Sequence, residues 1–190
     1  MSAEPFIAVL IGPGGVGKGT LARRLVEADD RLWLSKSWTT RPVRETEDGS
    51  EYHFVDRAAF EKAIEDDAFL EWAEFHGNLY GTPRPEAGDH DVLLEIEGQG
   101  AEQVLAHDPS AVGVLVLAPS MEQLEQRLRG RGDSDEHVEK RLSSAPHELA
   151  KGHAIATRVV VNDDVERTTS EILSILEELR PSRRSPSKKD

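Results

Sequence analysis

Residues 12–20, near the N-terminus, combine five glycines with a lysine and a threonine. Glycines let the backbone turn tightly, so that successive N–H groups face one cavity, and the positive end of a following helix strengthens their attraction for phosphate. From this position Lys18 can reach the outer phosphates of a nucleotide. A turn that merely joined two elements would lose conformational entropy at each glycine, so we favour a phosphate-binding loop. Its residues are Gly12, Pro13, Gly14, Gly15, Val16, Gly17, Lys18, Gly19 and Thr20.

The segments on either side have the composition that such a loop requires. Residues 6–11 are apolar and largely β-branched, which predicts a buried strand. After the loop, apolar residues recur at helical spacing, at Leu21, Ala22, Leu25 and Val26. The order strand, loop, helix is the context in which the motif binds phosphate.

Seven further motifs follow in the chain. They are Thr-Thr-Arg-Pro-Val-Arg at 39–44, Tyr-His-Phe at 52–54, Leu-Glu-Trp-Ala at 70–73, Tyr-Gly-Thr at 80–82, Arg-Gly-Arg-Gly at 129–132, Lys-Arg-Leu at 140–142 and Val-Asn-Asp-Asp at 161–164. Together with the loop, this ordered array resembles the guanylate kinase family over residues 6–179. The resemblance implies a nucleoside monophosphate kinase that transfers a phosphoryl group from MgATP to GMP, giving ADP and GDP.

The residue types between 37 and 82 suit the acceptor that this resemblance implies. Arg41 and Arg44 can give forked hydrogen bonds to a monophosphate, and the hydroxyls of Tyr52 and Tyr80 can add to them. Guanine presents two N–H donors together, so the carboxylate of Glu71 can read it, whereas adenine would leave that carboxylate unpaired. By resemblance, Ser37 and Thr82 contact the base on its O6 side.

Each of these residues also has a plainer interpretation. The two arginines could be solvated surface charges, Glu71 could lie on an exposed helix face, and the two tyrosines could be half-buried core residues. Trp38 and Trp72 we assign to packing. Because all of these residues occur together, in one ordered array that follows a phosphate loop, we favour the binding role.

The resemblance also implies roles for acidic residues and the metal. Glu95 and Glu97 follow a predicted strand, at the edge where open α/β sheets bind ligands. Glu95 would face magnesium-bound water and Glu97 the guanine amino group, although the family usually has Asp at the second position. Gly19 stands where a hydroxyl usually helps to hold Mg²⁺, so phosphates and water would hold most of the metal, with Thr20 as a helper. The expected cofactor is Mg²⁺, bound as MgATP.

The ATP side of the site draws on the second half of the chain. By resemblance, Arg131 and Arg141 clamp the ATP phosphates and neutralise charge in the transition state. Asn162 is expected to contact the adenine, and an aspartate after it to cap the last helix. Arg127 and Arg129 are expected to be surface residues. The catalytic set is therefore Lys18, Arg44, Arg131 and Arg141.

Alternating strands and helices predict an α/β fold, a three-layer sandwich with a parallel sheet core. Further strands are expected at 92–96, 112–117 and 159–161, and further helices at 99–106, 121–130, from 134, and through 172–179; Pro146 should end or kink the helix that starts at 134. One kinase-like domain would span 1–182, with its core at about 4–33 and 90–180. A GMP-binding insertion, with short strands and a helix near 58–65, would occupy 34–89. A small lid would lie at 127–150, and a disordered basic tail at 183–190.

The composition narrows the class of protein. A formal charge of −13 argues against a general binder of nucleic acid or membranes. Cysteine is absent, so there are no disulfides or thiolate sites. We expect a cytoplasmic protein whose partners are ATP and GMP; the oligomeric state stays open.

Two other functions fit parts of this pattern. A kinase for a phosphorylated sugar could use the same scaffold but would not need Glu71. A non-catalytic guanylate-kinase-like binding module would share the fold, although such modules tend to lose the phosphate loop.

Overall fold

The computed structural model describes residues 5–43, 49, 52–75, 77–85, 90–96, 98–132 and 134–180. Arg44, Glu97 and the predicted tail at 183–190 lie outside these residues, so the expectations for them stay predictions.

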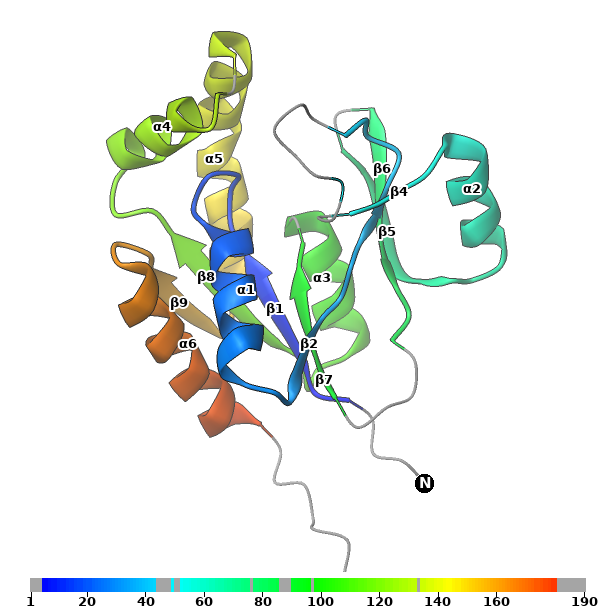
Figure 1. Ribbon diagram of the computed structural model, residues 1–190, viewed down its shortest axis with the longest axis horizontal. Coiled ribbons are helices and arrows are strands. Elements are labelled where there is room, and N and C mark those ends of the chain that lie inside the picture. Colours follow the sequence, from blue (N-terminus) through cyan, green and yellow to red (C-terminus); the bar gives the residue numbers. More distant parts are fainter. Residues whose placement is uncertain are drawn as a thin grey trace, which may run out of the picture.

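A central sheet of five parallel strands carries the core of the molecule (Figure 1). The strand order is β2-β7-β1-β8-β9. The central strands β1 and β8 are built mainly of buried apolar residues, and the middle of β7 is buried and apolar as well, as expected for strands covered on both faces. Their bounds are β1 Ile7–Ile11, β2 Leu32–Leu34, β7 Asp91–Glu95, β8 Val112–Leu117 and β9 Arg158–Val161.

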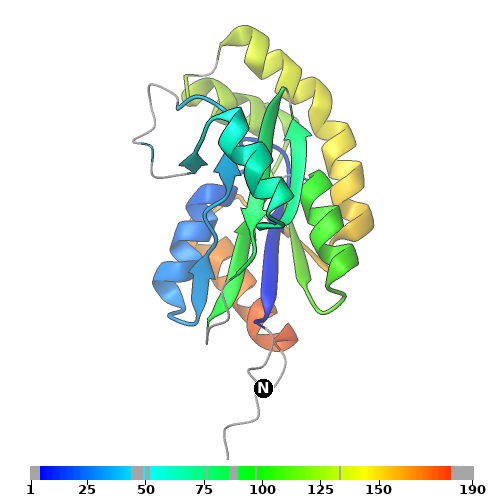
Figure 2. The same ribbon diagram turned by 90° about the vertical axis from the view of Figure 1, so that its right-hand side faces the viewer.

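Helices cover both faces of this sheet, which confirms the predicted three-layer α/β sandwich (Figures 1 and 2). Helices α1 (Lys18–Ala28) and α6 (Val165–Leu179) pack on one face, and α3 (Gly98–His107) packs on the other. Helix α4 (Met121–Gly130) leads into the long α5 (Asp135–Ile155), whose C-terminal end joins the α3 layer.

A second, four-stranded sheet forms from residues inserted between β2 and β7 (Figure 2). Its order is β4-β3-β6-β5, and it carries helix α2 on a small core of its own around Phe60 and Phe69. The bounds are β3 Trp38–Thr39, β4 His53–Phe54, α2 Arg57–Glu65, β5 Phe69–Phe75 and β6 Asn78–Pro83. The expected short strands and single helix of the insertion are therefore present.

Of the two outcomes expected at Pro146, one is excluded. The helix does not end there, because α5 continues through the proline to Ile155, and the kink stays a prediction. The proline removes one backbone donor, but buried neighbours hold the helix on both sides of it. Ala145 is fully buried, and Gly152 packs so closely on Leu115 that an added Cβ would lie 2.6 Å from its Cδ1.

Strand β2 was not predicted from the sequence. It has only three residues, and the side chain of its middle residue, Trp33, is 45% exposed. A strand this short has no clear hydrophobic pattern in the sequence. In the structure it is recognised by its parallel pairing with β7.

Candidate active site

The glycine-rich loop joins the carboxyl end of β1 to the first turn of α1, as the sequence predicts. Gly17 caps the helix with φ of 99°, a left-handed conformation that favours glycine. Within α1, which is described in full, the first turn has no acidic residue, and Gly17 offers no side-chain cap. The helix end therefore presents free backbone donors and positive potential, which suits a phosphate.

Lys18 is the first residue of α1, and its side chain is held inside the loop. The residue is only 6% exposed. Its Nζ donates to the carbonyl oxygen of Gly12 at 2.5 Å and to that of Pro13 at 3.3 Å. The ammonium group therefore lies within the loop, against its backbone carbonyls, which is a suitable position for a phosphate-binding lysine.

Arg141 reaches the same loop from α5. Its guanidinium lies where a side chain at residue 14 would begin: an added Cβ on Gly14 would be 3.1 Å from Cζ and still nearer to Nη1. Gly14 therefore leaves room for a second cation beside Lys18. The placement supports the predicted role of Arg141, whereas Arg131 is exposed at the end of α4 and its role stays a prediction.

Arg127 is not the surface residue that we expected. It is half-buried, and its Nη2 donates to the carbonyl oxygen of Asn162 at 2.7 Å while Nη1 donates to that of Val16 at 3.3 Å. Arg127 and Arg129 are two residues apart in the same charged stretch, and nothing in the sequence indicated that Arg127 alone would be half-buried. Arg129 is exposed as predicted, and it pairs with Glu125 and Asp135.

Asn162 also lies beneath the loop. It is 2% exposed, and its Nδ2 donates to the carbonyl oxygen of Val16 at 2.8 Å. An added Cβ at Gly17 would lie 2.5 Å from that nitrogen. The side chain therefore supports the loop, and the adenine contact expected of Asn162 stays a prediction. Asp164 caps α6 by accepting from the N–H of Arg167 at 2.8 Å, as expected for one of the two aspartates.

Glu95 lies beside the loop, at the carboxyl end of β7. An added Cβ on Gly19 would lie 3.1 Å from Glu95 Oε2, so the glycine at this position leaves room for the carboxylate. Thr20 is exposed in the same turn of α1. Mg²⁺ in nucleotide sites is commonly bound through one or two carboxylates, substrate phosphates and water. The Glu95 carboxylate fits that donor set, and the helper role of the Thr20 hydroxyl stays a prediction.

Glu71 and Thr82 form a buried pair in the inserted sheet. They face each other across β5 and β6, and Thr82 Oγ1 donates to Glu71 Oε1 at 2.5 Å. Glu71 is 6% exposed and Thr82 is fully buried. Burial raises the pKa of Glu71 above its ordinary value of 4.5, and the hydrogen bonds from Thr82 oppose the rise. The alternative of an exposed helix face is thereby excluded for Glu71.

Three of the predicted phosphate ligands lie together on the same sheet. The Tyr52 and Tyr80 rings are 6.1 Å apart, and the Arg41 guanidinium lies 5.5 Å from the Tyr52 ring. Arg41 also donates to the carbonyl oxygen of Pro42 at 2.7 Å. Ser37 is buried just before β3. The arrangement gathers a cation and two phenols, which suits an anionic group.

The two tryptophans differ. Trp38 packs edge-on against Phe69 at 5.5 Å, as predicted. Trp72 is 43% exposed on the edge strand β5, so the packing role assigned to it is wrong. Its side chain alternates with that of Glu71, which takes the buried face.

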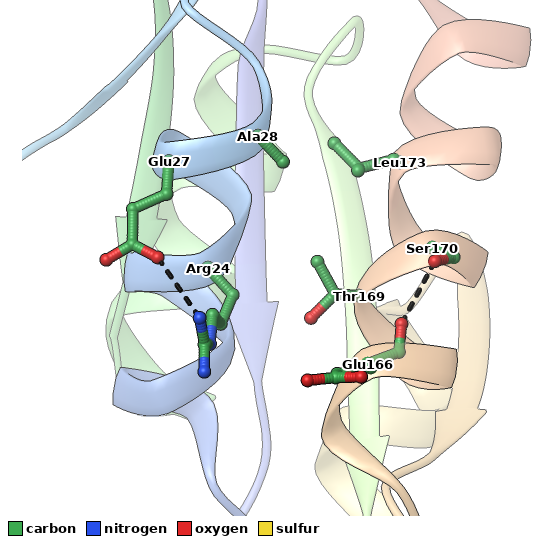
Figure 3. A pocket seen from close by; sticks show the side chains of 7 residues that line it. All are labelled: Arg24, Glu27, Ala28, Glu166, Thr169, Ser170 and Leu173. Atoms are coloured by element: carbon green, nitrogen blue, oxygen red, sulfur yellow. Dashed lines mark hydrogen bonds and ion pairs between the residues drawn. The ribbon is translucent and has the colours of Figure 1, made fainter.

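A hollow of about 250 Å³ lies elsewhere, between α1 and α6 (Figure 3). Its lining residues are Arg24, Glu27, Ala28, Glu166, Thr169, Ser170 and Leu173, none of which belongs to the predicted site. Over the part of the chain that is described, no three His, Cys, Asp or Glu residues gather as a metal cluster, and no helix is long and apolar enough to cross a membrane.

A phosphate loop at the carboxyl edge of a parallel sheet, with a converging lysine and arginine and an inserted polar sheet, defines a P-loop phosphotransferase. Comparisons with known proteins narrow this class. The guanylate kinase family model matches residues 5–179. On this evidence the chain belongs to the guanylate kinase family.

Individual relatives agree with the family match. The chain is 47% identical to a guanylate kinase from Chromobacterium violaceum over 90% of this chain and 84% of the relative. It is 45% identical to one from a Synechococcus strain, over 86% and 90% of the two chains. The crystal structure of guanylate kinase from Anaplasma phagocytophilum superposes with a TM-score of 0.75 at 32% identity, covering 92% of this chain and 85% of that one.

Proposed function

We propose that this protein is a guanylate kinase, which transfers the γ-phosphoryl group of MgATP to GMP and releases ADP and GDP. The observation that carries the proposal is the buried Glu71–Thr82 pair, set in an inserted sheet of a chain that also has the Lys18 loop. A buried carboxylate that accepts one hydroxyl still has lone pairs for the two adjacent N–H donors of guanine.

The loop would hold ATP. Backbone N–H groups of residues 12–20 and the start of α1 would bind the phosphates, and Lys18 would contact the outer ones. Arg141 lies at Gly14, near enough to neutralise charge that spreads over the transferred group. Arg131 and Arg44 complete the proposed cationic set.

The acceptor side would hold GMP by both of its ends. Glu71 would accept from the guanine, Ser37 and Thr82 would lie near its O6 side, and Glu97 near its amino group. Arg41, Arg44, Tyr52 and Tyr80 would hold the phosphate. No side-chain nucleophile is needed: a GMP phosphate oxygen attacks the γ-phosphorus in line, and the bond to the ADP oxygen breaks.

Glu95, through water, and Thr20 are the residues proposed to hold the metal. When bound, Mg²⁺ neutralises charge on the phosphates. Closure of the insertion and the α4–α5 segment over the substrates would exclude water and so limit idle hydrolysis of ATP. The cytoplasmic location and the lid at 127–150 remain predictions.

Two variants on the same strand test the substrate. Glu71→Gln removes the charge and replaces one of the two carboxylate oxygens by an NH2 group, so one of the guanine N–H groups would lose its acceptor. We therefore expect kcat/KM for GMP to fall by at least about 100-fold and the preference for GMP over AMP to narrow. Glu74→Gln is the matched control, since Glu74 is exposed and pairs only loosely with Arg57 at 3.4 Å. Unchanged GMP preference in Glu71→Gln would show that Glu71 does not read the base. Turnover of the wild-type protein without GMP preference would point to a different acceptor, such as a phosphorylated sugar.

A further inference from the structure

The carboxylate of Glu71 has a second neighbour besides Thr82, and this neighbour belongs to helix α3 of the core. Gly100 lies in the first turn of α3, and an added Cβ there would be 2.8 Å from Glu71 Cδ and 3.1 Å from Oε1. It would approach Oε2 more closely still. Glu71 belongs to strand β5 of the inserted sheet and Gly100 to helix α3 of the core. The contact therefore joins the inserted sheet to the core.

Neither partner has room to move away. Glu71 is 6% exposed, and Oε1 is held by Thr82 in a fixed register between β5 and β6. On the other side, Ala101 and Val104 anchor α3 in the core with no exposed surface. A methyl group at residue 100 would therefore displace the carboxylate or push the two layers apart.

The helix end also acts on the charge of Glu71. The first turn of α3 contains no acidic residue among its described positions, and its backbone N–H groups give it a positive end. A glycine lets the carboxylate approach this end without an intervening side chain.

We propose that Gly100 is a positioning residue for base selection: by having no side chain, it lets the Glu71 carboxylate lie against the first turn of α3, in the orientation that reads guanine. The inference rests on the proposed function, because it concerns how Glu71 discriminates among monophosphates. Gly100 itself contacts no substrate in this account.

The chain supplies a matched control in the same helical turn. Gly98 has no neighbouring atom within 4 Å of an added Cβ. Gly98→Ala and Gly100→Ala therefore make the same chemical change in the same turn, but only the second crowds Glu71. We expect Gly98→Ala to keep the wild-type KM for GMP.

Steady-state kinetics then separate positioning from a general structural effect. In Gly100→Ala, KM for GMP should rise by about tenfold or more, as for a lost hydrogen bond to a charged group, and the ratio of kcat/KM for GMP to that for AMP should fall. KM for ATP should stay at the wild-type value, since the loop is untouched. Equal constants in the two alanine variants, or equal losses for ATP and GMP, would overturn the proposal.

A double variant keeps the test decisive if Gly100→Ala does not fold. Glu71→Asp draws the carboxylate back by one methylene, so Gly100→Ala should cost less in that background, both in Tm and in GMP turnover. Additive losses, or a double variant that folds no better than Gly100→Ala, would contradict crowding at Glu71. If the wild-type protein itself shows no GMP-dependent turnover, the proposed function fails, and the Tm cycle alone still tests the contact.

Discussion

At the scale of single residues, the buried carboxylate proposed to select guanine, that of Glu71, lowers the folding stability of the protein at neutral pH. The carboxylate is buried, with one hydroxyl partner in Thr82 and a helix end at Gly100. Burial raises its pKa, because the charged form loses its water. The folded protein therefore binds the Glu71 proton more tightly than the unfolded chain does, and the ionised carboxylate works against folding at neutral pH.

This opposition predicts a pH-dependent gain in stability for Glu71→Gln. The proton-linked stability from Glu71 is fully present below its ordinary pKa of 4.5 and is lost as the pH rises through the raised folded value. The glutamine side chain does not titrate, so the variant should be more stable than wild type at pH 7, by about 2–4 °C in Tm for each kcal/mol gained. The advantage should disappear near pH 4.5. Thermal unfolding between about pH 4 and 8 measures it, and an advantage that grows toward low pH would contradict the account.

At the scale of elements, the phosphate loop is held in place by hydrogen bonds from helix α4 and from the segment after strand β9. Val16 accepts hydrogen bonds from Arg127 of α4 and from Asn162, which follows β9. Arg127 also donates to Asn162, so the three residues form a closed set. The predicted lid segment is thus tied to the phosphate loop through its first helix.

Arg127→Ala should therefore weaken the use of ATP. Losing hydrogen bonds from a charged donor costs about 1.5–3 kcal/mol, so kcat/KM for ATP should fall roughly tenfold or more. Arg129→Ala, on the same helix, removes exposed ion pairs and should leave kcat/KM for ATP within about twofold of the wild-type value. Equal effects of the two substitutions would show that the contact to Val16 does not position the loop.

The helices and strands could be predicted from the sequence more completely than the contacts between side chains. The loop lies where its glycines predicted it, and the strand at 112–117 and the helix ending at Gly130 lie where their apolar residues predicted them. Two differences have physical causes. Tertiary packing around Ala145 and Gly152 carries α5 through Pro146, so the helix does not end there, which was one of the two outcomes expected. Strand β2 is too short for a hydrophobic pattern to show. Arg127 could not be told from Arg129, because both occur in one charged helical stretch and only the fold turns one of them inward.

At the scale of the whole molecule, an ion cluster near the C-terminal end of α6 ties distant parts of the chain together. Arg180 pairs with Asp91, at the start of β7, at 2.6 Å and with Asp29, at the end of α1, at 3.0 Å. Asp91 is 1% exposed. Arg31, chiefly, and Arg180 lower the pKa of Asp29 to about 2. The stability from Asp29 is present above its ordinary value of 3.8 and is lost as the pH falls through about 2.

Arg180→Ala should be strongly destabilising. It takes a cation away from the buried Asp91 carboxylate, which costs about 3–5 kcal/mol. Urea unfolding at neutral pH measures the loss. Arg158→Ala is the matched control, because Arg158 pairs with Glu178 at the surface and such pairs contribute about 0–1 kcal/mol. Similar midpoints for the two variants would contradict the buried cluster.

The most direct test of the central claim is ADP formation by the purified protein with ATP and Mg²⁺, run with GMP, AMP, CMP or UMP as acceptor. We expect ADP formation that depends on GMP, with GDP as the second product, and its abolition in Lys18→Ala. ADP formation without preference for GMP would contradict the role of Glu71. Tight binding of GMP with no turnover would show instead a binding module built on the kinase fold.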